Sequence, residues 1–173
     1  TPLMTVKVFV SRDSEGRPWP PDYSHEVNAC QAIVSDIYYR LNHHNQLYVI
    51  VANLHQPSAD LVVITERGLG VAELKGHGGR ITVHKNGYWY ADRQLIKAGG
   101  QSDTPHEQVQ TYARKLRQAL WSFIAPETLR YKSWQTGDLK FQTAVCFTNP
   151  SAELSQIRTV FQDPSRIERA PWE

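Results

Sequence analysis

Two carboxylates and a lysine are predicted to meet at one end of a β-hairpin. Asp60 begins one apolar stretch, Glu73 and Lys75 end the next, and residues 66–68 form the turn between them. Residues two apart on a strand point to the same face, so Glu73 and Lys75 project together while Leu74 faces the opposite side. The start of the first strand of a hairpin lies beside the end of the second, so Asp60 is expected next to Glu73.

This arrangement suits metal-assisted chemistry on a phosphate group. Mg²⁺ is a hard cation that takes one or two carboxylates together with water and phosphate oxygens. An ammonium at Lys75 can orient or deprotonate an attacking water, or neutralise charge on a phosphoryl group. The alternative is an exposed ion pair at a strand end. The buried character of residues 70–72 argues against it, because charged groups at the end of a buried strand need partners.

Composition sets the class of protein within which this chemistry must work. The chain has 173 residues, 40% of them hydrophobic and 21% charged, which fits one folded domain rather than a disordered chain or a coiled coil. No apolar run reaches the length of about 18 residues that a membrane span requires. Two cysteines and no visible secretory leader predict a reduced, cytoplasmic protein. The net charge of +2 decides little about partners.

The first half of the chain is predicted to hold a strand, a helix and three further strands. Residues 3–10 and 47–53 read as strands, and residues 60–65 and 69–74 as the hairpin that carries the acidic residues. Between the first two strands, residues 24–42 form a helix. Its apolar residues recur at steps of three and four, as one buried helical face requires: Val27, Cys30, Val34, Ile37 and Leu41.

The second half adds a hairpin, a helix and a late strand. Residues 80–84 and 88–91 flank an Asn-Gly pair that favours a tight turn. Thr104 is the N-cap of a second helix, followed by a first-turn proline and a capping-box glutamate. Its buried face is Val109, Tyr112, Leu116, Leu120 and Phe123. Residues 141–148 form the last strand. This order predicts an α/β fold with a mixed central β-sheet flanked by helices.

Four segments together resemble the nuclease-related domain (NERD) family of the PD-(D/E)XK nuclease superfamily. They are residues 59–64, 70–76, 105–108 and 144–149, and the resemblance runs from about residue 24 to residue 149. It implies a restriction-endonuclease-like core within a single domain of residues 1–173. This domain is expected to be the N-terminal module of a longer protein.

The resemblance implies Mg²⁺-dependent cleavage of phosphodiester bonds in DNA, with Mn²⁺ as a substitute ion and RNA as the open alternative substrate. Asp60 and Glu73 match the family's metal ligands, and the backbone carbonyl of Leu74 is often a further one. Glu26 matches a glutamate that binds a second metal or acts through water. Its alternative role is to complement the dipole at the start of its helix. Lys75 matches the catalytic lysine.

Two departures from the family pattern are visible. Ala59 stands where the superfamily has its name-giving proline, and Leu61 stands where many members have histidine. Neither change removes a metal ligand.

Further site residues are expected on the second helix and in basic positions around it. Gln108 matches a family glutamine that reaches phosphate or the attacking water; its alternative is a solvated polar side chain. Tyr112 completes a Gln-x-x-x-Tyr pair similar to that of RecB-type nucleases, with a core aromatic residue as its alternative. Four basic residues are predicted to line a DNA path, the alternative being solvated surface: Lys85, Arg93, Lys97 and Arg114.

A rival interpretation keeps the fold and gives the domain another task. In this view the chain is a regulated or catalytically weak nucleic-acid-binding module of a multidomain signalling or defence protein, since family members occur fused to kinases and helicases. A fused or partner regulatory domain and a homo-oligomer are the partners that it predicts. An intact ligand set argues against simple decay of the site.

Overall fold

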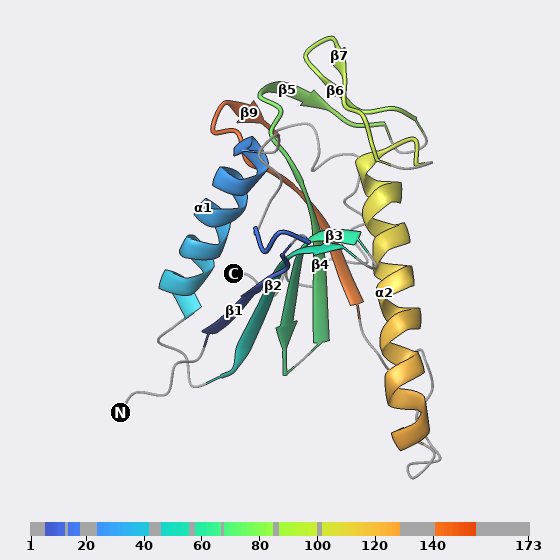
Figure 1. Cartoon of the computed structure of the whole chain (residues 1–173). Coiled ribbons are helices and arrows are strands. Elements are labelled where there is room, and N and C mark those ends of the chain that lie inside the picture. Colours follow the sequence, from blue (N-terminus) through green and yellow to red (C-terminus); the bar gives the residue numbers. More distant parts are fainter. Residues whose placement is uncertain are drawn as a thin grey trace.

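A computed structural model gives the fold in Figure 1 and describes residues 6–12, 14–17, 24–41, 46–55, 58–66, 68–84, 87–99, 102–128 and 141–154. The side chains of residues 24–27 and 123–128 lie outside that description. Along the described chain, one strand precedes the first helix, six strands lie between the two long helices, and two strands follow the second helix. The sequence predicts both helices and their order among the strands.

A five-stranded mixed sheet carries the hairpin with the acidic residues. Its strand order is β1-β2-β3-β4-β8, with bounds Val6–Val10, Tyr48–His55, Ser58–Thr65, Gly68–Lys75 and Phe141–Phe147. The pairs β1·β2 and β4·β8 are parallel, whereas β2·β3 and β3·β4 are antiparallel. The predicted mixed α/β fold is confirmed, and it is compatible with a restriction-endonuclease-like core.

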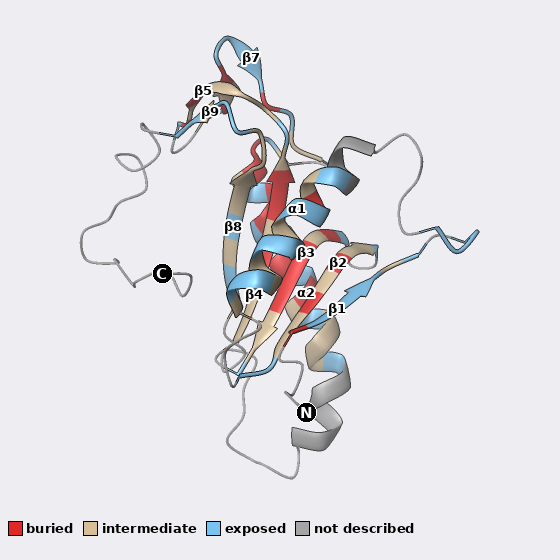
Figure 2. Cartoon of the chain, turned by 90° about the vertical axis from the view of Figure 1, so that its left-hand side faces the viewer, coloured by how far each residue is buried: buried red, intermediate tan, exposed pale blue. Residues whose placement is uncertain are grey.

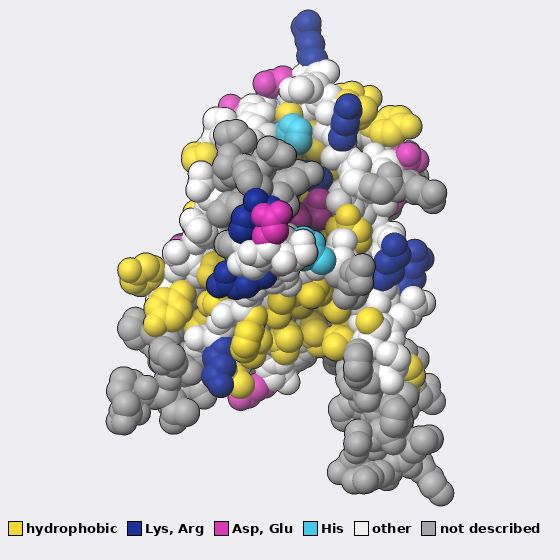
Figure 3. All heavy atoms as spheres, viewed as in Figure 1, with side chains coloured by type: hydrophobic (Ala, Val, Ile, Leu, Met, Phe, Trp, Pro, Cys, Tyr) yellow, Lys and Arg dark blue, Asp and Glu magenta, His cyan; other side chains and the backbone are white. Residues whose placement is uncertain are grey.

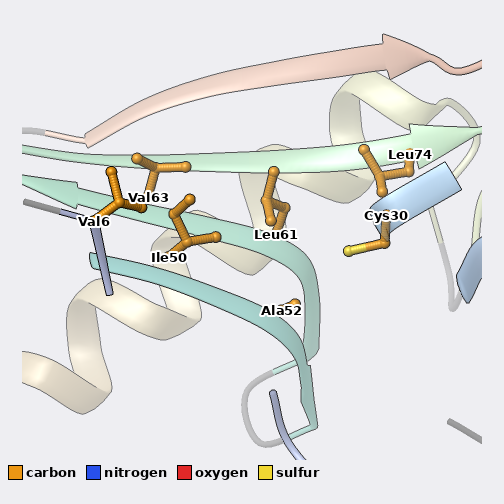
Figure 4. Packing of buried hydrophobic residues seen from close by; sticks show 7 residues of the cluster. All are labelled: Val6, Cys30, Ile50, Ala52, Leu61, Val63 and Leu74. Carbon is orange, nitrogen blue, oxygen red and sulfur yellow. The ribbon is translucent and has the colours of Figure 1, made fainter. Parts of the chain in front are cut away.

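The two helices cover opposite faces of this sheet (Figure 1). Helix α1 (Ser24–Leu41) packs on one cluster of buried residues, which contains Cys30, Leu61 and Leu74 and is drawn in Figure 4. Helix α2 (Pro105–Thr128) packs on another, which contains Val62. Residues 61 and 62 of β3 thus pack under different helices, because side chains alternate between the two faces along a strand. Figure 2 shows the buried residues concentrated on the central strands.

The predicted second hairpin belongs to a small separate sheet instead of the central one. Strands β5 (Gly79–Thr82), β6 (Tyr90–Ala91), β7 (Gln94–Leu95) and β9 (Ala152–Glu153) pair in the order β7-β6-β5-β9. Strands β5 and β6 are shorter than the predicted strands at residues 80–84 and 88–91. This small sheet has its own core: Ile81, Val83, Trp89, Ala91 and Ile96, packed against the end of β8. A strand pattern identifies strands but not the sheet that they join.

The start of α2 is fixed by a cap that differs slightly from the predicted one. Thr104 is buried, and its Oγ1 accepts a hydrogen bond from the N–H of Glu107 at 3.1 Å, as a capping box requires. The Glu107 carboxylate, however, accepts from the N–H of Asp103 rather than from that of Thr104. The N–H of Gln108 donates to the carbonyl of Thr104, the cap residue, so the cap determines where Gln108 lies in the first turn of the helix.

We expect Thr104→Ala to lower the free energy of unfolding by about 1 kcal/mol, the ordinary cost of losing an N-cap side chain. Urea denaturation measures the change. Ser122→Ala is the matched control, because this exposed hydroxyl donates to the Ala119 carbonyl of the same helix and caps no helix end; its effect should stay below about 0.5 kcal/mol. Equal effects in the two variants would contradict a special role for the cap.

No helix among the described residues is long and apolar enough to cross a bilayer.

Candidate metal-dependent active site

Asp60 lies at the point where β3 separates from β4. The last paired residues at this end are Leu61 and Ala72, and one step further the Asp60 carboxylate replaces a backbone partner. Its Oδ2 accepts the N–H of Leu74 at 2.8 Å. A carboxylate that bonds to the strand end in this way lies beside Glu73, the residue before Leu74.

Glu73 is a buried carboxylate with one oxygen bonded and the other without a partner. Its side chain is only 4% exposed; Oε1 accepts the Lys75 ammonium at 2.8 Å, while the buried Oε2 receives no hydrogen bond from a donor among the described residues when both carboxyl groups are ionised. Burial, then the negative charge of Asp60, and last a hydrogen bond from the protonated Glu73 carboxyl to Asp60 raise the pKa of Glu73 from 4.5 to about 7, although Lys75 acts in the opposite direction.

Lys75 lies on the same face of β4 as Glu73, turned toward α2. Its side chain is 12% exposed, and its Nζ donates a second hydrogen bond to Oε1 of Gln108 at 3.3 Å. Leu74 faces the opposite side and packs in the cluster under α1. The alternation of a strand thus separates the ion pair from the apolar core.

Gln108 is one of the few buried polar residues among the described positions. It is 5% exposed, so the interpretation as a solvated side chain is wrong. Besides Lys75, its Oε1 accepts the N–H of Gly99 at 2.9 Å, and its Nε2 donates to the Tyr112 hydroxyl at 2.9 Å. Tyr112 packs against the cluster under α2, which favours its reading as a core aromatic residue.

The donor set around Asp60 fits a hard divalent cation. Glu73 Oε2 is a buried acceptor without a donor among the described residues, and the Lys75 ammonium bonds to Glu73 while Asp60 adds a second negative charge beside it. The N–H of Leu74 points toward Asp60, and the carbonyl of the same residue points to the same flank of an antiparallel strand. Two carboxylates and a carbonyl are therefore oxygen donors of the kind that Mg²⁺ prefers, and they are the residues that would hold such an ion here.

No cluster of three or more His, Cys, Asp or Glu residues able to hold a metal occurs among the described side chains. Glu26 lies in α1, but its side chain falls outside the description. Cys30, one helical turn later, is buried, and its thiol pKa is raised to about 11 by burial and then by the charge of Asp60.

The basic residues expected along a DNA path lie on separate parts of the fold. Arg93 and Lys97 are exposed on the small sheet and the loop that leaves it, and Arg114 is exposed on α2. Lys85 lies outside the described residues. On the face of the molecule that is drawn in Figure 3, the Lys and Arg side chains form scattered groups rather than one continuous patch.

Three neighbours of the site, on two of its flanks, were missed by sequence reasoning. Gly99 contacts Gln108 so closely that a Cβ there would lie 2.8 Å from Nε2. At the other flank, the N–H of Thr148 donates to the Lys75 carbonyl at 2.9 Å, and Asn149 Nδ2 donates to the Gly76 carbonyl at 3.3 Å. The Gly-Gly pair at residues 99–100 was a visible signal for a close approach.

The mixed sheet with two carboxylates and a lysine at one strand end is compatible with a nuclease core. A family model described as "Nuclease-related domain" (NERD) matches residues 28–148, more than two thirds of the chain. The chain therefore belongs to the nuclease-related domain family, as its motifs predicted. Glu26 lies just before the matched range. Comparisons with curated proteins and with solved structures give no match.

Ionisation of Glu73 is expected to oppose folding in the metal-free protein. Its folded pKa of about 7 lies above the ordinary 4.5. Between these two pH values the unfolded chain releases the proton while the folded chain keeps it. Stability therefore falls as the pH rises from about 4.5 to about 7 and is level above.

Glu73→Gln removes this ionisation while it keeps an acceptor for Lys75. The variant should be more stable than the wild type by about 3 kcal/mol near pH 8, and about equally stable near pH 4. Denaturation curves in EDTA at both pH values measure the difference. If Glu73→Gln were more stable than the wild type only at acid pH, the pKa of Glu73 would not be raised in the folded protein.

Proposed function

We propose that this domain is a Mg²⁺-dependent nuclease that hydrolyses phosphodiester bonds of DNA. The observation that carries the proposal is the buried Glu73 oxygen without a partner, next to Asp60 and opposite a lysine ammonium. A structural ion pair alone does not explain two carboxylates with one countercharge, because an uncompensated buried carboxylate costs free energy. Membership of the nuclease-related domain family supports the same chemistry.

Each residue of the site has a distinct role in this proposal. Asp60, Glu73 and the Leu74 carbonyl hold Mg²⁺, and Glu26 contributes a further or water-mediated ligand. The bound ion supplies a Lewis acid for the phosphate and lowers the pKa of its water. Lys75 orients the attacking water or neutralises charge that develops on the phosphoryl group. Mn²⁺ has the same preference for oxygen ligands and can substitute.

In this proposal, basic residues on separate parts of the fold contact the phosphate backbone of the substrate at separate points. Arg93, Lys97 and Arg114, with Lys85, attract the polyanion without reading its sequence. Binding is therefore expected to weaken with salt, and each alanine substitution at a contacting residue should lower the salt slope by about one.

The proposal is tested by incubating the full chain with DNA in Mg²⁺, Mn²⁺, Ca²⁺ and EDTA. Supercoiled plasmid, linear duplex, single-stranded DNA and RNA of matched length serve as substrates. We expect cleavage in Mg²⁺ and Mn²⁺, faster on DNA than on RNA, and none in EDTA. Equal nicking in EDTA would overturn the mechanism. Salt-dependent DNA binding without cleavage in any metal would favour the rival regulated module.

A further inference from the structure

We propose that Gln108 positions Lys75 and does not itself contact the substrate, and that the backbone of Gly99 holds Gln108 in place. The loop that leaves the small sheet would then determine where the lysine points. This inference rests on the proposed function, in which Lys75 acts at the phosphate.

The hydrogen bonds of Gln108 leave its oxygen no acceptor site for a substrate or a water. An amide oxygen has two lone pairs, and here one receives the Lys75 ammonium and the other the Gly99 N–H, at 3.3 and 2.9 Å. Both neighbours can only donate, so the atom that faces them must be the oxygen and not the amide nitrogen. The nitrogen donates to the Tyr112 hydroxyl, which fixes the other end of the amide.

Burial makes this network rigid and its loss costly. Gln108 is 5% exposed and the Lys75 side chain is 12% exposed. The ammonium is therefore held by two acceptors, Glu73 and Gln108, that come from different elements and lie on one side of the sheet. Without Gln108, only Glu73, a residue of the same strand, would restrain the lysine among the acceptors that the structure describes.

Gly99 connects this pair to the small sheet. Ile96 is fully buried in the core of that sheet and donates its N–H to the Trp89 carbonyl at 2.8 Å, so the loop is anchored three residues before Gly99. A Cβ at residue 99 would lie 2.8 Å from Nε2 of Gln108 and 3.4 Å from the Tyr112 hydroxyl. Glycine is what allows the backbone to come close enough to bond the amide.

Two substitutions of Gln108 separate positioning from substrate contact. Gln108→Glu keeps two acceptor sites for Lys75 and Gly99, whereas Gln108→Met keeps the length and loses the acceptor. A displaced catalytic group costs about 100-fold, so Gln108→Met should lose about that factor in kcat with KM changed by less than about threefold. Gln108→Glu should stay within about tenfold of the wild type.

The reverse order would overturn the inference. If the amide nitrogen of Gln108 bound the phosphate, a carboxylate would repel it, and Gln108→Glu would be no more active than Gln108→Met. Denaturation curves establish that each variant folds. If Gln108→Met does not fold, the glycine pair carries the test: Gly99→Ala should lose about tenfold in kcat, and Gly76→Ala should not, since nothing lies within 4 Å of a Cβ at residue 76. Equal losses in both would count against the role of Gly99.

A readout without catalysis distinguishes failure of this inference from failure of the proposed function. In ¹⁵N–¹H spectra of the metal-free protein, an ammonium held by two acceptors exchanges its protons slowly. The Lys75 signal should be visible in the wild type and in Gln108→Glu, and lost in Gln108→Met. A signal unchanged in Gln108→Met overturns the positioning role. A wild type that shows the signal but cleaves no DNA instead counts against the proposed nuclease.

Discussion

Asp60→Asn is expected to reduce Mg²⁺-dependent DNA cleavage by about 1000-fold, because the proposed metal ligand loses its negative charge. The proposed ion then stabilises the transition state by several kcal/mol less. The asparagine oxygen can still accept the Leu74 N–H, so the end of the hairpin should keep its structure. The variant thereby separates the charge of Asp60 from its hydrogen bond. A cleavage assay on plasmid DNA, beside calorimetric titration of Mg²⁺, measures both consequences.

The same variant makes an independent prediction about Glu73. The charge of Asp60 raises the pKa of Glu73, so its removal should move that pKa down toward 4.5. NMR titration of the Glu73 carboxyl carbon detects the change. Glu153→Asn is a suitable control, since this carboxylate is exposed on β9. Full cleavage by Asp60→Asn would mean that the active site lies elsewhere.

Lys75→Ala should lower cleavage by about 1000-fold or more while Mg²⁺ affinity stays roughly intact or rises, because a positive charge next to the ion has been removed. The ammonium also lowers the pKa of Glu73, so the titration is made well above neutral pH, where Glu73 is ionised in both proteins. Calorimetry beside the cleavage assay gives the two quantities. Loss of metal binding in Lys75→Ala would make the lysine a structural residue.

Lys75→Arg distinguishes two roles for the lysine. A cation that only neutralises phosphate charge can be replaced in part by guanidinium. A group that positions or deprotonates water cannot, because guanidinium stays protonated and has a different reach. Gln108 also matters here, since its oxygen accepts the lysine at 3.3 Å in a space with little room for a larger group. Lys7→Arg, at an exposed position on β1, is the control for a general effect of the substitution.

The sequence determined the central hairpin and the residues that it carries. The turn at residues 66–68 and the apolar runs on either side predict β3 and β4, and period-two alternation puts Glu73 and Lys75 on one face. The start of α2 was also predictable, because the helix cap depends on the types of four adjacent residues. These are local features, fixed by backbone geometry within a few positions.

Only the tertiary structure decided what lies around that hairpin. The hydrogen bond between Lys75 and Gln108 joins residues 33 apart and exists because α2 docks on the sheet with its first turn over β4. The approach of Gly99 depends on a small sheet whose strands looked like part of the central one. The Glu73 oxygen left without a partner follows from burial by several elements at once. Periodicity specifies which face of an element is buried, but not which other element covers it. The site forms because particular elements pack against one another, and periodicity does not determine which ones do.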